Sequence, residues 1–178
     1  MIVALDLATL TGFAYGPGDT GELPMLGSVR MPSTGDDLGR FLRFYRDWLT
    51  GMLSEVEPTI LIYESPVLHN STSLMTVRKL NGLCGMTEVV AGDLNLAYRK
   101  NGDAEIELAE VSPTSVKKAL TGNGRAEKDD MIRAARLYGL NPACSDEADA
   151  FGVWLYAVRK RFPTLAHHWD PLTQGRAA

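Results

Sequence analysis

The sequence predicts an α/β fold in which a mixed five-stranded sheet is flanked by helices. Residues 2–6 and 59–63 are continuous apolar runs, which are typical of strands buried on both faces of a sheet. Apolar residues recur at helical spacing between Leu38 and Val56. The order of elements is three strands, helix, strand, helix, strand and then helices, and 178 residues suffice for one such domain.

The first three strands are expected at residues 2–6, 13–15 and 25–31. Thr11-Gly12 predicts a tight turn between the first two strands, and the Gly-Pro-Gly at 16–18 predicts a second turn. Because the connections are short, the three strands are expected to form an antiparallel meander.

The amphipathic pattern over residues 38–56 predicts a helix of about five turns, capped by Asp36 or Asp37 and ended by Pro58. A fourth strand at 59–63 comes next. Ser65-Pro66 prevents a regular continuation, and a polar loop is expected over residues 67–73.

The longest predicted helix runs from about residue 73 to 99 and contains Gly82, Gly85 and Gly92. Glycine costs a helix about 1 kcal/mol relative to alanine, so three of them call for an explanation. One interpretation is that they let another backbone approach closely, which makes this helix the candidate dimer surface. An equally good interpretation is that they are kinks or tolerated defects.

The remaining elements are a fifth strand and three helices. We expect the strand at 105–111, a short helix at 113–120, another at 127–138, and a last helix at 146–160 that is capped by Ser145. The domain organisation is therefore one domain over residues 1–161 and a partly ordered C-terminal tail over residues 162–178.

Composition excludes several classes of protein. No apolar run is long enough to cross a membrane, and residues 1–5 start directly into a strand-like run, so we expect an uncleaved cytoplasmic protein. Cys84 and Cys144 have neither metal-ligand nor redox spacing, which favours two reduced thiols and argues against structural zinc. The formal charge of −4 is unusual for a nucleic-acid-binding protein, which makes the distribution of charge more informative than its total.

Four carboxylates are the candidate functional residues. Asp6 and Glu64 each end a predicted buried strand, and Asp146 and Asp149 share one face of the first turn of the last helix. Each acid also has a plain structural interpretation, since strands end at the surface and acids near a helix N-terminus complement the helix dipole. The dipole does not explain why the same helix continues with the apolar residues of a sheet-packing face.

Four clustered carboxylates would repel one another in the absence of cations. Hard divalent cations that prefer oxygen ligands remove that repulsion, and Mg²⁺ binds a few carboxylates while keeping water ligands. We therefore expect two Mg²⁺ ions per site, with Mn²⁺ as a substitute. Two such ions can activate a water on one side of a phosphodiester and stabilise the leaving oxygen on the other. Two bound ions would also balance the charge of the four acids.

Four segments resemble the RuvC family of Holliday junction resolvases, in the family's order and over most of residues 1–160. IVALDLATLTGFAY is similar to the family's first acidic strand, and ILIYESP to its second acidic motif. SPTSVKKALTGNGRAEKDDM resembles the lysine-bearing segment, and SDEADAFGVWLYA the terminal helix.

This resemblance implies an RNase H-like fold, a homodimer, Mg²⁺ dependence, and paired nicks across a four-way DNA junction. By position it makes Asp6, Glu64, Asp146 and Asp149 the metal ligands. Lys117 and Lys128 match the family's functional lysines, which would contact phosphate or stabilise developing charge. The wider set of residues expected to bind DNA is Lys117, Lys118, Arg125, Lys128, Arg78 and Lys79.

One departure from the family leaves the substrate open. Many members have an aromatic residue shortly after the second acid, where this chain has Val67-Leu68-His69-Asn70. A broader nuclease for branched DNA or flaps is therefore an alternative, as are an RNase H-like nuclease acting on RNA and a non-catalytic binder of branched DNA. A sugar-kinase-like ATPase is disfavoured by chain length, and since no phosphate-binding P-loop is present we expect no nucleotide cofactor.

Overall fold

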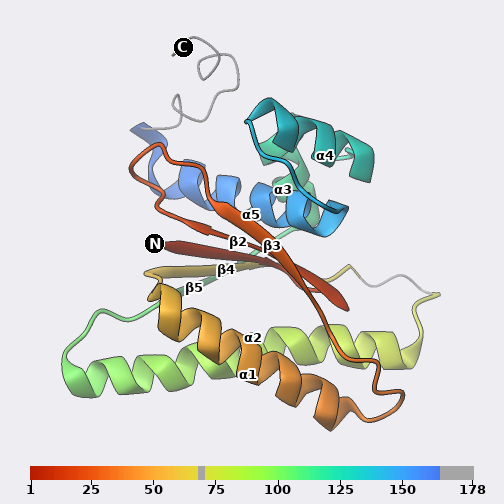
Figure 1. Cartoon of the computed structure of the whole chain (residues 1–178), viewed down its shortest axis with the longest axis vertical. Coiled ribbons are helices and arrows are strands. Elements are labelled where there is room, and N and C mark those ends of the chain that lie inside the picture. The colour runs from red at the N-terminus through yellow and green to blue at the C-terminus, as the bar shows by residue number, and fades with distance from the viewer. Residues whose placement is uncertain (68–70, 165–178) are drawn as a thin grey trace.

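The computed structural model describes residues 1–67 and 71–164, and a five-stranded sheet in the order β3-β2-β1-β4-β5 lies at its centre (Figure 1). The strands are β1 (Ile2–Asp6), β2 (Leu10–Gly16), β3 (Met25–Arg30), β4 (Ile60–Glu64) and β5 (Glu107–Val111). The helices are α1 (Leu38–Val56), α2 (Leu74–Asn101), α3 (Pro113–Thr121), α4 (Lys128–Leu137) and α5 (Ser145–Arg161).

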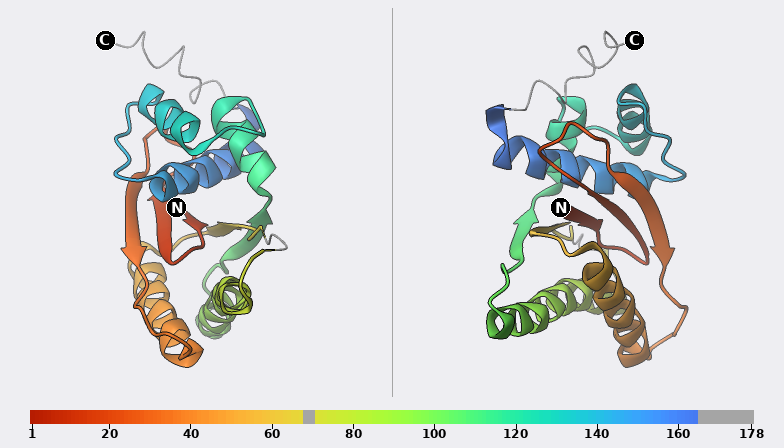
Figure 2. Two further views of the ribbon diagram at one scale, coloured as in Figure 1. Left: turned by 90° about the vertical axis from the view of Figure 1, so that its right-hand side faces the viewer. Right: turned by 60° about the vertical axis from the view of Figure 1, so that its left-hand side comes forward.

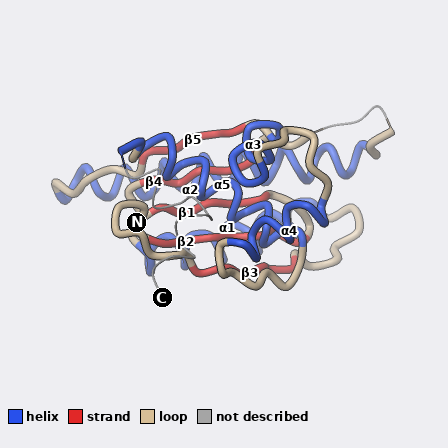
Figure 3. Tube along the Cα trace, turned by 90° about the horizontal axis from the view of Figure 1, so that it is seen from above, coloured by secondary structure: helices blue, strands red, loops and turns tan. Residues whose placement is uncertain are grey.

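The sheet is mixed, as the sequence predicts. Strands β3, β2 and β1 form the antiparallel meander, whereas β1, β4 and β5 run parallel. Seen from above, β3 and β5 lie at the two outer edges and β1 lies in the middle (Figure 3). The chain crosses from β3 to β4 through α1, and from β4 to β5 through α2, so that β1 and β4 become parallel neighbours.

Helices cover both faces of the sheet, with α3, α4 and α5 on one face and α1 and α2 on the other (Figures 1 and 2). Alternate residues of a strand point to opposite faces. Ile2 and Ala4 of β1 accordingly belong to the core beneath α5, while Val3 and Leu5 belong to the core beneath α1 and α2. The prediction that β1 is buried on both faces is confirmed.

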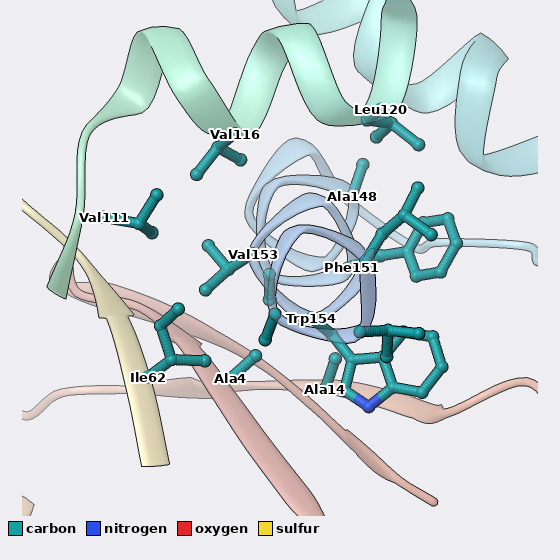
Figure 4. Close-up of a cluster of buried hydrophobic side chains, with 14 of the residues drawn as sticks. Ala4, Ala14, Ile62, Val111, Val116, Leu120, Ala148, Phe151, Val153 and Trp154 are labelled. Carbon is teal, nitrogen blue, oxygen red and sulfur yellow. The ribbon is translucent and has the colours of Figure 1, made fainter. Parts of the chain in front are cut away.

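Helix α5 is the central element of its layer. It packs against β1 and β2 on one side and against α3 and α4 on the other. Figure 4 shows its residues Phe151, Val153 and Trp154 between the strands and α3. All three side chains are fully buried, and the indole N–H of Trp154 lies 3.5 Å from the carbonyl oxygen of Gly16. A helix apolar on nearly all sides is what such an enclosed position requires.

The predicted turn at Thr11-Gly12 is wrong, because both residues lie inside β2. Gly12 is paired with Asp6 across the β1–β2 ladder. The reason for glycine is a close approach from outside the sheet: a Cβ atom at this position would lie 2.0 Å from the carbonyl oxygen of Asp146. The absence of a side chain therefore lets the start of α5 rest directly on β2.

Helix boundaries agree with the sequence to within two or three residues. The carboxylate of Asp37 accepts a hydrogen bond from the Arg40 N–H and caps α1, as expected. Ser145, expected to cap α5, is instead its first residue, and Cys144 occupies the cap position without a side-chain hydrogen bond. The two cysteines are free thiols, as predicted.

The three glycines of α2 differ in their surroundings. A Cβ atom on Gly82 would lie 3.0 Å from the Leu42 side chain, so this glycine serves the packing of α1 on α2 within the chain. Gly85 and Gly92 have no such neighbour among the described residues and lie on the exposed face of the helix. A buried hydrogen bond of 2.7 Å between the hydroxyls of Tyr45 and Thr87 also joins α1 to α2.

The chain beyond the end of α5 is described only in part. Phe162 packs against the core directly after the helix, whereas residues 165–178 of the expected tail lie outside the described residues. Of the helices in the described part of the chain, none has the length and apolar character that a membrane span requires.

Candidate active site

Asp6 and Glu64 lie side by side where two parallel strands end. The register pairs Leu5 of β1 with Tyr63 of β4, so the next residues, Asp6 and Glu64, emerge together at the same edge. Both acids have the strand parity of Ile2, Ala4, Ile60 and Ile62, which face α5. Their side chains are therefore directed to the same face as α5.

The first turns of α5 bring two more acids to this edge. Asp146 and Asp149 are both half-buried and are three residues apart on one side of the helix. The contact of the Asp146 backbone with Gly12, which is the ladder partner of Asp6, sets the start of α5 over the end of β1. The four acids of the prediction thus come from three separate elements and meet at one place.

Two lysines complete the same site. Ser112 caps α3 and turns the chain after β5, which places Lys117 near the acids. Lys128 is the first residue of α4, whose start is fixed by a reciprocal capping box between Glu127 and Asp130. A cleft of about 520 Å³ results, lined by Asp6, Leu7, Ala8, Glu64, Ser65, Pro66, Val67, Leu80, Pro113, Thr114, Lys117, Gly124, Lys128, Met131, Asp146 and Asp149.

Burial and mutual repulsion raise the pKa values of three of the four acids. Burial, followed by repulsion from Glu64, Asp149 and Asp146, raises the pKa of Asp6 well above its ordinary value, against the attraction of Lys128. Burial and then Asp149 raise the pKa of Glu64 to about 7. These shifts show that the protein alone neutralises the group of acids incompletely.

Asp149 behaves in the same way. Burial is the largest cause of its shift and Asp146 adds repulsion, while Lys128 and Lys117 act in the opposite direction, and its pKa becomes about 6. The two lysines are therefore close enough to stabilise negative charge in the cleft. A bound phosphate would compete with the acids for that attraction.

The donor set of the cleft fits hard divalent cations. Within residues 1–67 and 71–164, no group of three or more acidic, histidine or cysteine side chains is arranged as a formed metal site. Carboxylates that repel one another are expected to stand apart without a cation between them. The four acids offer oxygen ligands alone, and no cysteine or histidine is among the cleft-lining residues that the structure describes. This chemistry is the one that Mg²⁺ and Mn²⁺ prefer.

The other basic residues predicted to bind DNA lie outside the cleft. Lys118 is exposed and lines a separate groove with Ala119, Leu120 and Arg159, because consecutive helical residues point in different directions. Arg125 is exposed beside Gly124, at the rim of the cleft. In α2, Arg78 is exposed, and the ammonium group of Lys79 lies 5.0 Å from the centre of the Phe41 ring.

Sequence reasoning missed one acid next to the site. Glu147 directly follows Asp146 in the first turn of α5, yet it is buried, with 8% of its surface exposed. A glutamate at the third position of a helix commonly reaches back to a free backbone N–H. This signal appears only once the helix is seen to begin at Ser145, because the sequence places its start at residue 146. Thr114 and Ser65, which also line the cleft, gave no such signal.

Comparison with known sequences identifies relatives over most of the chain. No protein-family model matches. The crossover junction endodeoxyribonuclease RuvC of Anaeromyxobacter dehalogenans strain 2CP-1 is 32% identical over 162 residues, which cover 90% of this chain and 74% of that protein. The enzyme of the same name from Rickettsia conorii is 30% identical over 146 residues, or 80% of this chain and 85% of the relative.

Solved structures agree at the level of the fold. Thermus thermophilus RuvC in complex with a Holliday junction substrate has a TM-score of 0.69 at 20% identity, and covers 92% of this chain and 96% of its own. The yeast mitochondrial Holliday junction resolvase has a TM-score of 0.60 at 13% identity, and the match covers 95% of this chain and 84% of the resolvase. The predicted RNase H-like fold is confirmed. With these relatives, this fold and four carboxylates gathered at one sheet edge, the chain belongs to the RuvC family of crossover junction endodeoxyribonucleases.

Proposed function

We propose that this protein is a Mg²⁺-dependent endonuclease that resolves Holliday junctions by paired, symmetric nicks. The observation behind the proposal is the convergence of four acids from β1, β4 and α5 with two lysines from α3 and α4 in one cleft. Family membership supports the reaction class, and the junction bound to the Thermus thermophilus relative supports the substrate.

In this proposal Asp6, Glu64, Asp146 and Asp149 hold two divalent cations. Bound ions would supply the Lewis-acid chemistry of phosphodiester hydrolysis, by lowering the pKa of an attacking water and neutralising charge on the leaving oxygen. The oxygen of the water bonds to phosphorus, the bond to the 3′-oxygen breaks, and that oxygen takes up a proton. The products are a 5′-phosphate and a 3′-hydroxyl.

The lysines act on the phosphate rather than on the water. Lys117 and Lys128 already attract the carboxylates of the cleft, so each is positioned to stabilise the extra negative charge that the phosphate acquires as the water adds. A lysine ammonium group is a compact point charge, which suits contact with a single phosphate oxygen. Lys118, Arg125, Arg78 and Lys79 would contact DNA outside the cleft.

The loop after Glu64 bears on which branched substrates are cleaved. Exposed Val67 lines the cleft, and residues 68–70, in the loop where the family's aromatic residue is absent, lie outside the described residues. Cleavage of flaps or other branched DNA is therefore the second candidate function, because Val67-Leu68-His69-Asn70 has no Phe, Tyr or Trp where the family places its aromatic residue.

We also propose that the protein is a homodimer joined through α2. Exposed residues recur every three or four positions along this helix, at 74, 78, 81, 85, 89, 92 and 96, and form one outer stripe. Leu74, Val89 and Leu96 expose 54% or more of their surface there, while Gly85 and Gly92 leave open space for a second backbone. A twofold dimer would supply the two active sites that paired nicks require.

The remaining proposals derive from this role. Residues 1–161 are proposed as the nuclease domain because α5, the last helix, ends at Arg161; Phe162 directly after it still packs against the core. We also propose a cytoplasmic location, in a bacterial cell or in a bacterial cell infected by a phage, where branched DNA would be available as the substrate.

The first prediction concerns the reaction and its substrate. In Mg²⁺ or Mn²⁺ the protein should nick a synthetic four-way junction symmetrically, and faster than a three-way junction, flap, loop or RNA–DNA hybrid in the same gel assay. Asp6→Asn should cleave at least about a hundredfold more slowly, since metal-ion catalysis contributes several kcal/mol. Asp6→Asn cleaving as fast as the wild type would refute the metal-site assignment, and preferred cleavage of the hybrid would favour the RNA nuclease.

The second prediction separates two adjacent lysines. Lys117→Ala and Lys128→Ala should lower the single-turnover cleavage rate by about a hundredfold, the usual cost of removing one group that stabilises a transition-state charge. Lys118→Ala, which changes a lysine of the separate groove, should stay within a few-fold of the wild type at saturating junction. Equal losses in Lys117→Ala and Lys118→Ala would contradict the assignment.

The third prediction concerns pH in the absence of metal. A carboxyl whose pKa is higher in the folded state favours the protonated form, so its contribution to stability is lost as pH rises. For Glu64 that loss runs from about pH 4.5 to its folded pKa of about 7. Glu64→Gln, which imitates the neutral acid, should therefore melt at a higher temperature than wild type in EDTA at pH 8. This difference in melting temperature should disappear as the pH is lowered toward 4.5.

Two comparisons support that measurement. The exposed Glu55 on α1 gives the control variant Glu55→Gln, whose difference from wild type should not change over this pH range. Adding Mg²⁺ at pH 8 should stabilise the wild type more than Glu64→Gln, since metal binding requires charged ligands. A difference in melting temperature between Glu64→Gln and wild type that grows toward low pH would contradict the raised pKa of Glu64.

The fourth prediction tests the assembly. In sedimentation velocity the wild type should be a dimer, and Val89→Glu or Leu96→Glu should shift it toward monomer, because a charge would be buried in the apolar part of the stripe. Leu137→Glu, at an even more exposed apolar residue on α4, is the control and should leave the dimer intact. A wild type that is monomeric with and without DNA would favour a single-strand or flap nuclease.

A further inference from the structure

Glu147 differs from the other acids of α5, because its carboxylate turns away from the cleft and into the protein. One oxygen, Oε1, accepts a hydrogen bond of 2.9 Å from the hydroxyl of Ser28 in β3. The other, Oε2, accepts a bond of 2.7 Å from the backbone N–H of Ala143, before the helix. Both oxygens of a buried carboxylate are thus bound at fixed points.

Those fixed points are aligned with the active site. The strand registers pair Asp6 with Gly12 and Gly12 with Ser28, so the three residues form one row across β1, β2 and β3. The Asp146–Glu147 backbone lies on the middle residue of this row, Gly12, and the Glu147 side chain is bonded to its outer residue, Ser28. The first turn of α5 is consequently anchored to the row that contains Asp6.

The bond to Ala143 fixes the same turn from the other end. Cys144 provides no side-chain cap for α5, and a glutamate at the third helical position instead holds the residue before the cap. The backbone of residues 143–147 is therefore closed into a loop by one side chain. This closed turn fixes the backbone from which the side chains of Asp146 and Asp149 extend into the cleft.

We propose that Glu147 is a positioning residue for the active site. It fixes the positions of Asp146 and Asp149 relative to Asp6, by bonding the start of α5 to Ser28 and Ala143. The proposal rests on the proposed function in that it assigns the four acids to metal binding. Groups that orient metal ligands commonly change metal affinity or activity by 10- to 100-fold when they are removed.

Three variants test the two bonds. Glu147→Ala removes both, whereas Ser28→Ala removes the bond to the sheet alone. Glu147→Gln keeps both, because the amide oxygen can accept from the Ala143 N–H while the amide NH₂ donates to the Ser28 hydroxyl oxygen. Glu55→Ala removes an exposed carboxylate from α1 and is the control for loss of charge.

Two readouts are needed, one of which does not involve DNA. Calorimetric titration with Mn²⁺ should give an affinity about 10- to 100-fold weaker for Glu147→Ala, and weaker on the order of threefold to tenfold for Ser28→Ala. Glu147→Gln and Glu55→Ala should stay within about threefold of the wild type. In junction cleavage, Glu147→Ala should need more Mg²⁺ for half-maximal rate and have a lower kcat, with KM for the junction nearly unchanged.

Several outcomes would overturn the proposal. A Glu147→Ala variant with a lower melting temperature but normal Mn²⁺ affinity would make Glu147 merely structural. Equal losses in the Gln and Ala variants would assign the effect to its charge and not to its bonds. If Glu147→Ala does not fold, Ser28→Ala and Glu147→Gln decide the same question.

The failure of this proposal is distinguishable from failure of the proposed function. A wild type that cleaves none of the branched substrates would refute the resolvase function, yet the Mn²⁺ titration would still measure how Glu147 affects the four acids. Asp6→Asn provides the reference for loss of metal binding in that titration. A wild type that binds no Mn²⁺ would refute both proposals together.

Discussion

The close approach of α5 to β2 at Gly12 is the contact on which the active site depends. Asp146 and Asp149 lie about 140 residues after Asp6 in the chain, and only the docking of α5 across the sheet brings them together. A side chain at position 12 would occupy the place of the Asp146 carbonyl group. The packing of the largest buried residues of α5, Phe151 and Trp154, is thereby coupled to the geometry of the acids.

That geometry has an energetic cost for the protein without metal. The site gathers acids whose pKa values are raised by burial and by mutual repulsion, and two lysines offset this in part. The two hydrophobic cores, one on each face of the sheet, supply the stability that such an arrangement requires. Functional sites are where a fold commonly departs from its most stable arrangement. Bound cations would turn the repulsion among these acids into attraction to the metal.

Local patterns in the sequence were enough to predict the sheet, its mixed topology and the meeting of Asp6 with Glu64, because two apolar strands end in an acid with the same parity. The spacing of Asp146 and Asp149 was equally readable on one helix. The turn expected at Thr11-Gly12 was wrong, since the reason for that glycine is a helix that begins more than a hundred residues later in the chain. The partners of Glu147 were missed for the same reason: its bond to Ser28 spans 119 residues.

The acidic net charge of the chain is compatible with a DNA substrate once its distribution is known. The four half-buried acids of the cleft equal the net charge of −4 and would be balanced by two divalent cations. Lys117 and Lys128 face the same cleft, and the exposed Arg125 follows Gly124, which lines it. A scissile phosphate would therefore meet positive charge from the metal ions and from the lysine-bearing segment. Local charge, and not the total of −4, governs how a phosphodiester approaches this site.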